Sequence, residues 1–267
     1  MKRQRLNWQE KVRKNVRKIM DFEHVKAVFE EYLNGYDREN DKVKLKIVHT
    51  YGVIRCSEEI GRRMGLQAED MELAKLIALL HDIGRFEQLK RFNSFEADTM
   101  DHATYGVKVL FEEGMIRQFI EEDTWDDVIR TAIAKHSDYE LTGITDERTL
   151  LHARLIRDAD KLDNCRVKLE DAMETLLDLS ADEVGKYAIS PKVREDAFAG
   201  KCICSKDRRT PMDYWVSYVA YFYDLNFQET LDIVAEEQYV KRIIGRVPYT
   251  NEQTKKTMEE LERQLTE

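Results

Sequence analysis

The sequence has few of the residues that break regular structure. Its 267 residues include 3 Pro and 11 Gly, about 5% together, where ordinary proteins use roughly 12%. All three prolines follow residue 190. This scarcity excludes collagen-like, low-complexity and turn-rich all-β proteins. It predicts long helices, above all in the first 190 residues.

Long apolar runs and cysteine are scarce as well. The apolar run from Leu76 to Leu80 is far shorter than the roughly 18 residues that a membrane span needs. No apolar signal-peptide core follows the basic start of the chain. Four cysteines in a chain of this length do not form a disulfide framework. We therefore expect a cytoplasmic protein that does not interact with a membrane.

Charge is distributed unevenly. Residues 1–20 contain eight Lys or Arg and one acid, whereas the other 247 residues have a net charge of −16 within the total of −9. Nucleic-acid binding needs basic surface for phosphate contacts, so the acidic body argues against a nucleic-acid partner. The basic residues 1–20 are interpreted as a solvated N-terminal helix or tip, although such a segment could also touch an anion.

The spacing of apolar residues predicts an all-α fold. Lys42 to Ile47 alternates as an edge strand would, but apolar positions from His49 to Ile60 continue at intervals of three and four, so one helix is expected over 41–64. Further helices are expected over 69–82, 101–113, 124–136, 146–165, 166–179, 191–199, 211–225, 228–245 and 250–265. Ala199 to Arg209 is the expected long loop.

These elements suggest three parts: the basic tip 1–20, a helical core 21–180, and a C-terminal helical extension 181–267 packed on that core. In the extension, Thr210 followed by Pro211 is a favourable helix start. The aromatic residues between Tyr214 and Tyr223 have helical spacing. Either a core stripe or a subunit interface, as in a homodimer, explains them.

Four of the six histidines lie on apolar faces of different expected helices, where solvation does not explain them. These are His49, His81, His102 and His136. Asp82 directly follows His81, and the segment from Arg157 to Asp163 carries three aspartates. Imidazole and carboxylate ligands together suit divalent transition metals, and a helical bundle can hold such a site between facing helices.

The ordered set of His49, His81-Asp82 and Asp160 resembles the HD-domain metal-dependent phosphohydrolases over roughly residues 40–180. Many members with two metals insert two further histidines, which His102 and His136 match. The resemblance implies an HD-like helical bundle that binds two divalent ions (Fe, Mn, Zn, Ni or Co). Asp82 would bridge the ions, with His49, His81 and Asp160 on one ion and His102 and His136 on the other.

Such a site would hydrolyse a phosphate mono- or diester of a small molecule, a nucleotide among the candidates. A bridging water becomes hydroxide near neutral pH, and the ions neutralise charge on the phosphoryl group. Arg85 and Lys161 are candidates to orient phosphate oxygens, although a surface charge would also explain either residue. Asp163 is a candidate general base or support for a ligand, and a helix-surface acid is the alternative. Asp158 is expected to cap a helix or to form an ion pair.

Other functions stay open at this stage. His136 is followed by Ser137, and the chain lacks the paired His-His-Glu and the Gly-Tyr-Pro signature of relatives that cleave cyclic di-GMP. The same ligand types would serve a mixed-valent di-iron oxygenase, and a non-catalytic metal- or nucleotide-binding module is a third possibility. His24 is interpreted as a surface residue and His152 as a packing residue. Cys202 and Cys204 lack the second pair of ligands that a zinc site needs.

Overall fold

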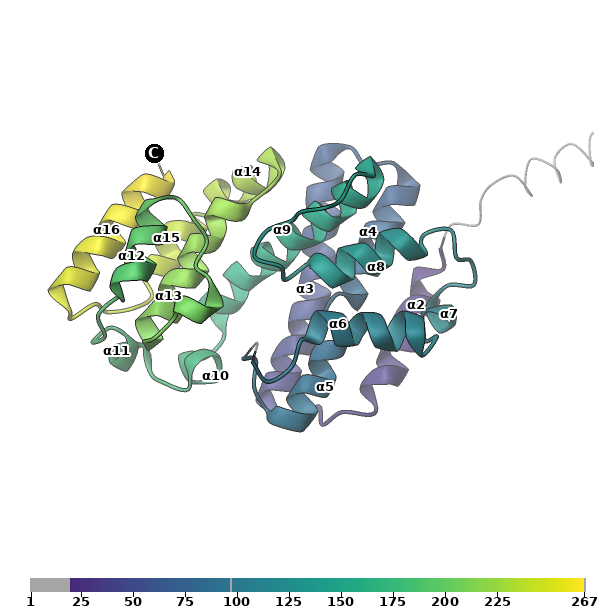
Figure 1. Ribbon diagram of the computed structural model, residues 1–267, viewed down its shortest axis with the longest axis horizontal. Coiled ribbons are helices and arrows are strands. Elements are labelled where there is room, and N and C mark those ends of the chain that lie inside the picture. The colour runs from purple at the N-terminus through teal and green to yellow at the C-terminus, as the bar shows by residue number, and fades with distance from the viewer. Residues whose placement is uncertain (1–19, 97, 267) are drawn as a thin grey trace, which may run out of the picture.

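Every regular element in the described residues, 20–96 and 98–266, is helical. The computed structural model therefore confirms the all-α prediction. Helices α2 to α8 gather at one end of the molecule and α10 to α16 at the other, with α9 reaching between them (Figure 1). Residues 1–19, which hold nearly all of the predicted basic tip, lie outside the described residues.

The first group of helices precedes the long helix α9. It comprises α2 (Phe22–Leu33), α3 (Asp41–Met64), α4 (Ala68–Leu80), α5 (Ile83–Phe92), α6 (His102–Val107), the π-helical segment Lys108–Glu112, α7 (Ile116–Phe119) and α8 (Asp126–Lys135).

The second group begins with α9 and carries the chain to its end. It comprises α9 (Glu147–Glu170), α10 (Met173–Leu177), α11 (Ala181–Val184), α12 (Pro191–Phe198), the 3-10 turn Ser205–Asp207, α13 (Pro211–Ala220), the 3-10 turn Tyr221–Asp224, α14 (Gln228–Glu236), α15 (Tyr239–Ile244) and α16 (Glu252–Thr266).

Local signals set the ends of the helices that were predicted well. The Asn40 side chain accepts hydrogen bonds from the first amides of α3, and Gly65 ends that helix in the left-handed conformation, with φ of 71°. Thr210 and Asp213 form a capping box around Pro211 at the start of α13. The expected loop from Ala199 to Arg209 contains only a single 3-10 turn.

Two expected divisions between neighbouring helices were wrong. The helices predicted over 146–165 and 166–179 are instead the continuous helix α9 followed by short α10, because no Gly or Pro interrupts the chain near residue 165. The helix predicted over 228–245 divides into α14 and α15, because Gln238 takes a left-handed conformation with φ of 53°.

Four helices were missed: α2, α5, α7 and α11. The most important omission is α5, which starts at Ile83, directly after the His81-Asp82 pair. Helix α4 therefore ends at Leu80 rather than at residue 82, and the pair occupies the turn between two helices. This turn aims both side chains into the interior, where both are buried.

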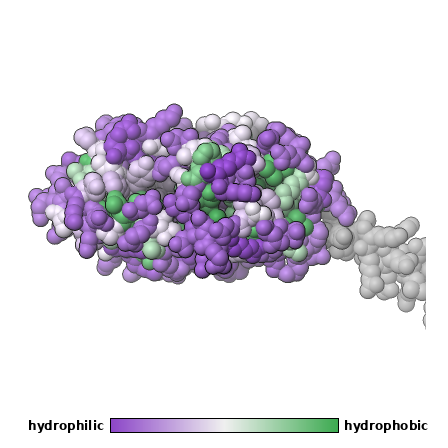
Figure 2. Space-filling view, turned by 90° about the horizontal axis from the view of Figure 1, so that it is seen from below, coloured by the Kyte–Doolittle hydropathy of each residue, from purple (hydrophilic) through white to green (hydrophobic). Residues whose placement is uncertain are grey.

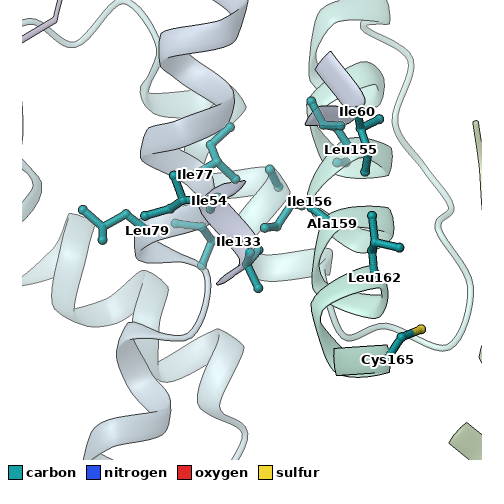
Figure 3. Packing of buried hydrophobic residues seen from close by; sticks show 14 of the residues in the cluster. Ile54, Ile60, Ile77, Leu79, Ile133, Leu155, Ile156, Ala159, Leu162 and Cys165 are labelled. Carbon is teal, nitrogen blue, oxygen red and sulfur yellow. The ribbon is translucent and has the colours of Figure 1, made fainter. Parts of the chain in front are cut away.

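The apolar core behind the histidines is built from four helices. Figure 3 shows Ile54 of α3, Ile77 of α4, Ile133 of α8 and Ile156 of α9 packed toward one another. Each of these side chains is no more than 6% exposed. Burial of an aliphatic side chain of this size contributes roughly 1.5–3 kcal/mol. The core therefore holds rigidly the helices from which the candidate ligands project.

The C-terminal helices are attached to α9 by buried polar contacts. Asp158 accepts hydrogen bonds from the backbone amides of Asn226 at 3.0 Å and Phe227 at 3.1 Å, and so caps the start of α14. Asp224 accepts from the Arg157 guanidinium at 2.6 Å and also pairs with Lys161. These contacts fix the C-terminal helices beside the part of α9 that carries Asp160.

One face of the molecule is largely polar. The face in Figure 2 is covered mainly by hydrophilic residues, with small apolar areas scattered among them. Among the described helices, none combines the length and the apolar character that crossing a membrane requires.

Candidate metal centre

The structure brings together all six side chains that were predicted as ligands. They come from α3 (His49), the turn after α4 (His81 and Asp82), the start of α6 (His102), the end of α8 (His136) and the middle of α9 (Asp160). The residues form two groups, and within each group the ligand atoms lie within 4.8 Å of one another. One group is His49, His81 and Asp160, and the other is Asp82, His102 and His136.

The carboxylate of Asp82 joins the two groups. Its Oδ2 lies 3.5 Å from His81 Nε2, whereas its Oδ1 lies 3.2 Å from His102 Nε2 and 3.6 Å from His136 Nε2. The two oxygens therefore face different groups. This is the geometry that a carboxylate shared by two ions requires.

Hydrogen bonds at Nδ1 orient three of the four imidazoles. His81 Nδ1 lies 2.7 Å from the Ala78 carbonyl oxygen, and His136 Nδ1 lies 2.7 Å from that of Ile133. A carbonyl can only accept, so each Nδ1 carries the proton and each Nε2 presents a lone pair to the cluster. Metal-binding histidines are typically fixed in this way.

The third imidazole, His49, is held by a carboxylate. Its Nδ1 lies 2.8 Å from Asp163 Oδ2, and Arg166 donates to both oxygens of Asp163 at 2.9 Å. Asp163 is 2% exposed, so the alternative of a helix-surface acid was wrong. It supports the ring of His49 from behind.

Close packing of α3 against α9 makes this support possible. A Cβ atom on Gly52 would lie 1.9 Å from Asp163 Oδ1. Only glycine at this position, three residues after His49, leaves room for the Asp163 carboxylate. On the other side of the cluster, Asn164 donates to Asp160 Oδ1 at 2.9 Å and steadies that ligand.

Burial keeps two of the histidines, His81 and His102, uncharged. Burial lowers the pKa of His81 to about 4, and burial together with the nearby Arg85 lowers that of His102 to about 3. Burial alone would raise the pKa of Asp82, but the Lys46 ammonium and His81 hold it well below its usual range. Neutral imidazoles beside ionised carboxylates are the protonation states that metal ligands need.

The donor set fits divalent metal ions. His81 Nε2 and Asp82 Oδ1 are buried and have no hydrogen-bond partner among the described residues. Such atoms are costly to bury unless a ligand engages them. Lys46 places its ammonium 2.6 Å from Asp82 Oδ2, so a cation already lies beside the shared carboxylate. Four imidazoles and two carboxylates suit transition metals better than Mg²⁺ or Ca²⁺.

The cluster opens into a cavity of about 580 Å³. Eight cationic side chains line it, namely Lys42, Lys46, Arg85, Arg157, Lys161, Lys168, Arg208 and Arg209. Arg85 donates to Gln88 Oε1 at 2.6 Å and lies 2.9 Å from His102 Nε2, so it borders the second group of ligands. Lys161 also lines the cavity, but its ammonium pairs with Asp224 and donates to that residue's carbonyl at 2.9 Å.

Comparison with known families identifies this part of the chain. Residues 47–165 match the family model of the HD domain. This region is an HD domain. All six candidate ligands lie within the matched HD segment, whereas α10 to α16 lie beyond it. HD domains are largely metal-dependent phosphohydrolases. No curated protein and no solved structure matches the chain.

Several residues at the HD site were missed from the sequence, although helical spacing contains a signal for most of them. Lys46 lies three residues before His49, and Asn164 and Lys168 lie four and eight residues after Asp160, so each shares a helix face with a predicted ligand. Arg208 comes from an irregular loop and has no such signal.

The remaining histidines and cysteines lie outside the HD ligand cluster. His24 is exposed, with Nε2 2.9 Å from the Gln118 carbonyl oxygen, as expected for a surface residue. His152 is buried and its Nε2 lies 3.0 Å from Asp70 Oδ1, which agrees with a packing role. Cys202 and Cys204 are free thiols in the cavity wall.

Proposed function

We propose that the protein is a metal-dependent phosphohydrolase that cleaves a phosphate mono- or diester of a small molecule, with nucleotides among the candidate substrates. One observation carries the proposal: two His/Asp groups share the carboxylate of Asp82 in a cavity lined by eight cations. The carboxylate and imidazoles suit the metal ions, and the cations suit an anionic substrate.

The ligand assignment follows the two groups. His49, His81 and Asp160 would hold one ion, and His102 and His136 the other, with Asp82 common to both. When bound, two divalent ions supply a nucleophilic water at neutral pH and neutralise charge that develops on the phosphoryl oxygens. The ordered Nδ1 contacts of His49, His81 and His136 prepare these side chains for that role.

Arg85 is the best-placed side chain to bind phosphate oxygens. Its guanidinium borders both His102 and Asp82, with Nε 3.7 Å from Asp82 Oδ1. The lone pair of His102 Nε2 serves one partner at a time. When this atom acts as a metal ligand, the Arg85 donor that faces it is free for a phosphate oxygen. Lys161 is already paired with Asp224, so Arg85 is the stronger candidate for binding phosphate oxygens.

The direct test is metal analysis of protein purified without chelators, combined with a panel of phosphate mono- and diesters assayed with Mn²⁺ and Fe²⁺. We expect bound transition metal and metal-dependent release of phosphate or of an alcohol. Both should be lost in His81→Ala and retained in His24→Ala, a matched change at an exposed histidine.

Three outcomes would overturn the proposal. Protein that binds no transition metal would exclude the metal centre. Metal-loaded protein that is inactive on the whole panel would exclude phosphohydrolase activity. Consumption of O₂ with an organic phosphonate or polyol, without phosphate-ester hydrolysis, would identify the di-iron oxygenase instead.

A further inference from the structure

A second concentration of positive charge lies in the same cavity, where α13 and the loop before it face the end of α9. The Arg208 guanidinium lies 4.2 Å from the centre of the Tyr214 ring, and the Lys168 ammonium lies 3.9 Å from that of Tyr218. The two tyrosines are four residues apart on α13, so their rings occupy one face of that helix. All four side chains line the cavity.

Lys168 is a buried cation with no charged partner in direct contact. The residue is 6% exposed, and its ammonium contacts Asn164 Oδ1 at 3.4 Å besides the Tyr218 ring. Burial, reinforced by the charge of Lys46, lowers the pKa of Lys168 to about 7. Burying an ammonium without a counter-charge destabilises a protein. A residue that carries such a cost at a cavity wall is suited to binding an anion.

Arg208 extends this positive surface. Its guanidinium is half-buried over Tyr214, and its Nε donates to the Ser205 carbonyl oxygen at 3.4 Å. Glu96 is the nearby acid, and its carboxylate accepts a hydrogen bond from the Tyr214 hydroxyl at 3.4 Å. The planar guanidinium keeps donors available for a second, bidentate anion contact.

These cations adjoin the metal centre without belonging to its ligands. The Lys168 ammonium donates to Asn164 Oδ1 at 3.4 Å, and Asn164 donates in turn to Asp160 Oδ1 at 2.9 Å, so one side chain lies between Lys168 and the ligand cluster. Lys168 and Arg208 both follow the segment that matches the HD-domain model, which ends at residue 165. The C-terminal helices therefore supply a wall that the matched domain does not contain.

We propose that Lys168 and Arg208 bind a second anionic group of the substrate, while its reacting phosphate lies at the metal centre. This inference rests on the proposed phosphohydrolase function. It assigns the substrate to small organic phosphates that carry another phosphate or a carboxylate at the far end of a short carbon skeleton. The C-terminal helices then determine which substrates are accepted.

The first test compares matched probes on metal-loaded protein. We expect kcat/KM for fructose 1,6-bisphosphate to exceed that for fructose 6-phosphate at least tenfold, or 3-phosphoglycerate to exceed glycerol 3-phosphate by this factor. The first pair tests a second phosphate and the second pair a carboxylate. In Lys168→Met and Arg208→Met the ratio should fall toward one, whereas Lys206→Met, an exposed neighbour outside the cavity lining, should retain it.

The second test does not depend on turnover. Inorganic phosphate is titrated calorimetrically into metal-free protein, and we expect its affinity to fall at least tenfold in Lys168→Met and not in Lys206→Met. The melting temperature of Lys168→Met should equal or exceed that of the wild type, because a buried charge is removed. Weaker phosphate binding would then not reflect unfolding.

The outcomes separate this inference from the function on which it rests. Wild-type protein that does not bind phosphate, or Lys168→Met that binds it equally well, overturns the second anion site even if metal-dependent hydrolysis is found. If phosphate binding depends on Lys168 but the protein neither binds metal nor hydrolyses esters, the anion site stands and the proposed function fails. Where esters are hydrolysed, probe ratios near one in the wild type also overturn the inference.

Discussion

The two ends of the cavity have opposite electrostatic character. At the ligand cluster, ionised carboxylates meet imidazoles, of which burial keeps His81 and His102 neutral. The Lys46 ammonium and the Arg85 guanidinium offset part of the negative charge there. The other end is the α13 wall, which consists of Tyr214 and Tyr218 of α13 with Lys168 and Arg208 packed against them. There the two cations contact tyrosine rings rather than carboxylates. Each end thus carries charge that the protein leaves incompletely compensated. The first end is prepared for cations and the second for an anion.

The two ends also differ in how their side chains are held. The imidazoles of His49, His81 and His136 each have a fixed hydrogen bond at Nδ1, and Asp163 is itself held by Arg166. Lys168 has a single long contact of 3.4 Å besides its ring. The comparison predicts a rigid metal centre and an anion site that adapts to its ligand.

The largest effect should follow from Asp82→Asn. This change removes the negative charge of the carboxylate whose two oxygens face the two ligand groups, so both ions and the hydrolytic activity should be lost together. We expect activity to fall by more than about a hundredfold, beyond the 10–100-fold typical of partners outside the ligand shell. Metal content by mass spectrometry and turnover measure this. Retention of both ions would contradict the bridging role, and Asp98→Asn, an exposed acid, is the matched control.

Arg85→Ala should separate catalysis from metal binding. Metal content should remain, because arginine is not a ligand, whereas kcat/KM should fall about ten- to a hundredfold, equivalent to roughly 1.5–3 kcal/mol for a charge-assisted contact. A rise in KM alone would indicate equal contact with bound substrate and transition state, and a fall in kcat would indicate contact with developing charge.

The control for this variant is Arg91→Ala, since Arg91 pairs with Glu87 on the exposed side of α5. Unchanged kinetics in Arg85→Ala would show that the phosphate oxygens are bound elsewhere. Lys46 and Lys135 would then be the next residues to vary.

Asp163→Asn should weaken the metal centre more mildly. The amide oxygen can still accept a hydrogen bond from His49 Nδ1, but the negative charge behind the ring is lost. We expect metal affinity to fall about tenfold, at the lower end of the range for such partners. Competition with a chromophoric chelator measures this affinity. Glu170→Gln alters the exposed partner of Arg166 and should have no effect; equal affinities in all three proteins would exclude a supporting role.

The smallest effect concerns the α13 wall and is a change in stability. The pKa of Lys168 is lowered from 10.5 to about 7 on folding, so between these values the unfolded chain binds more protons. Stability should therefore rise with pH across this window. Near pH 7, Lys168→Met should be roughly 1–2 kcal/mol more stable than the wild type, and the difference should shrink toward pH 10.

Urea unfolding of metal-free, phosphate-free protein at pH 7 and pH 10 tests this expectation. The other groups that act on Lys168 are Lys46, Asp160, Cys165 and Asp171, and all of them are retained in the variant. A variant that is less stable than the wild type at pH 7 would show that Lys168 is a structural residue and not one reserved for an anion.

Most residues of the metal centre could be predicted from the sequence, whereas few residues of the proposed anion site could. Four of the six predicted ligands lie on a helix or at a helix end, and spacing alone placed His49 and His136 on buried faces. The adjacent pair His81-Asp82 was found, but its turn was not, because the start of α5 at Ile83 has no capping residue with a side-chain hydrogen bond. Tertiary contact rather than local signal sets that boundary.

The α13 wall could not be predicted for a different reason. Arg208 reaches the cavity from a loop, and the aromatic stripe predicted as core or interface contributes Tyr214 and Tyr218 to the cavity lining, while Trp215 alone is fully buried. Which face of a stripe lines a cavity depends on how distant helices pack. The ion pair between Asp224 and Arg157 joins residues 67 positions apart, and no local sequence pattern predicts such a contact.

Gly52 has a consequence for how substitutions in this protein would be interpreted. It has no side chain, and the space that a Cβ atom would take is occupied by the Asp163 carboxylate. In a saturation-mutagenesis survey scored by activity, position 52 would therefore behave like a ligand position: even alanine would be selected against. A map of tolerated residues would mark a glycine in the middle of α3 as essential, and the reason would lie in the carboxylate of another helix.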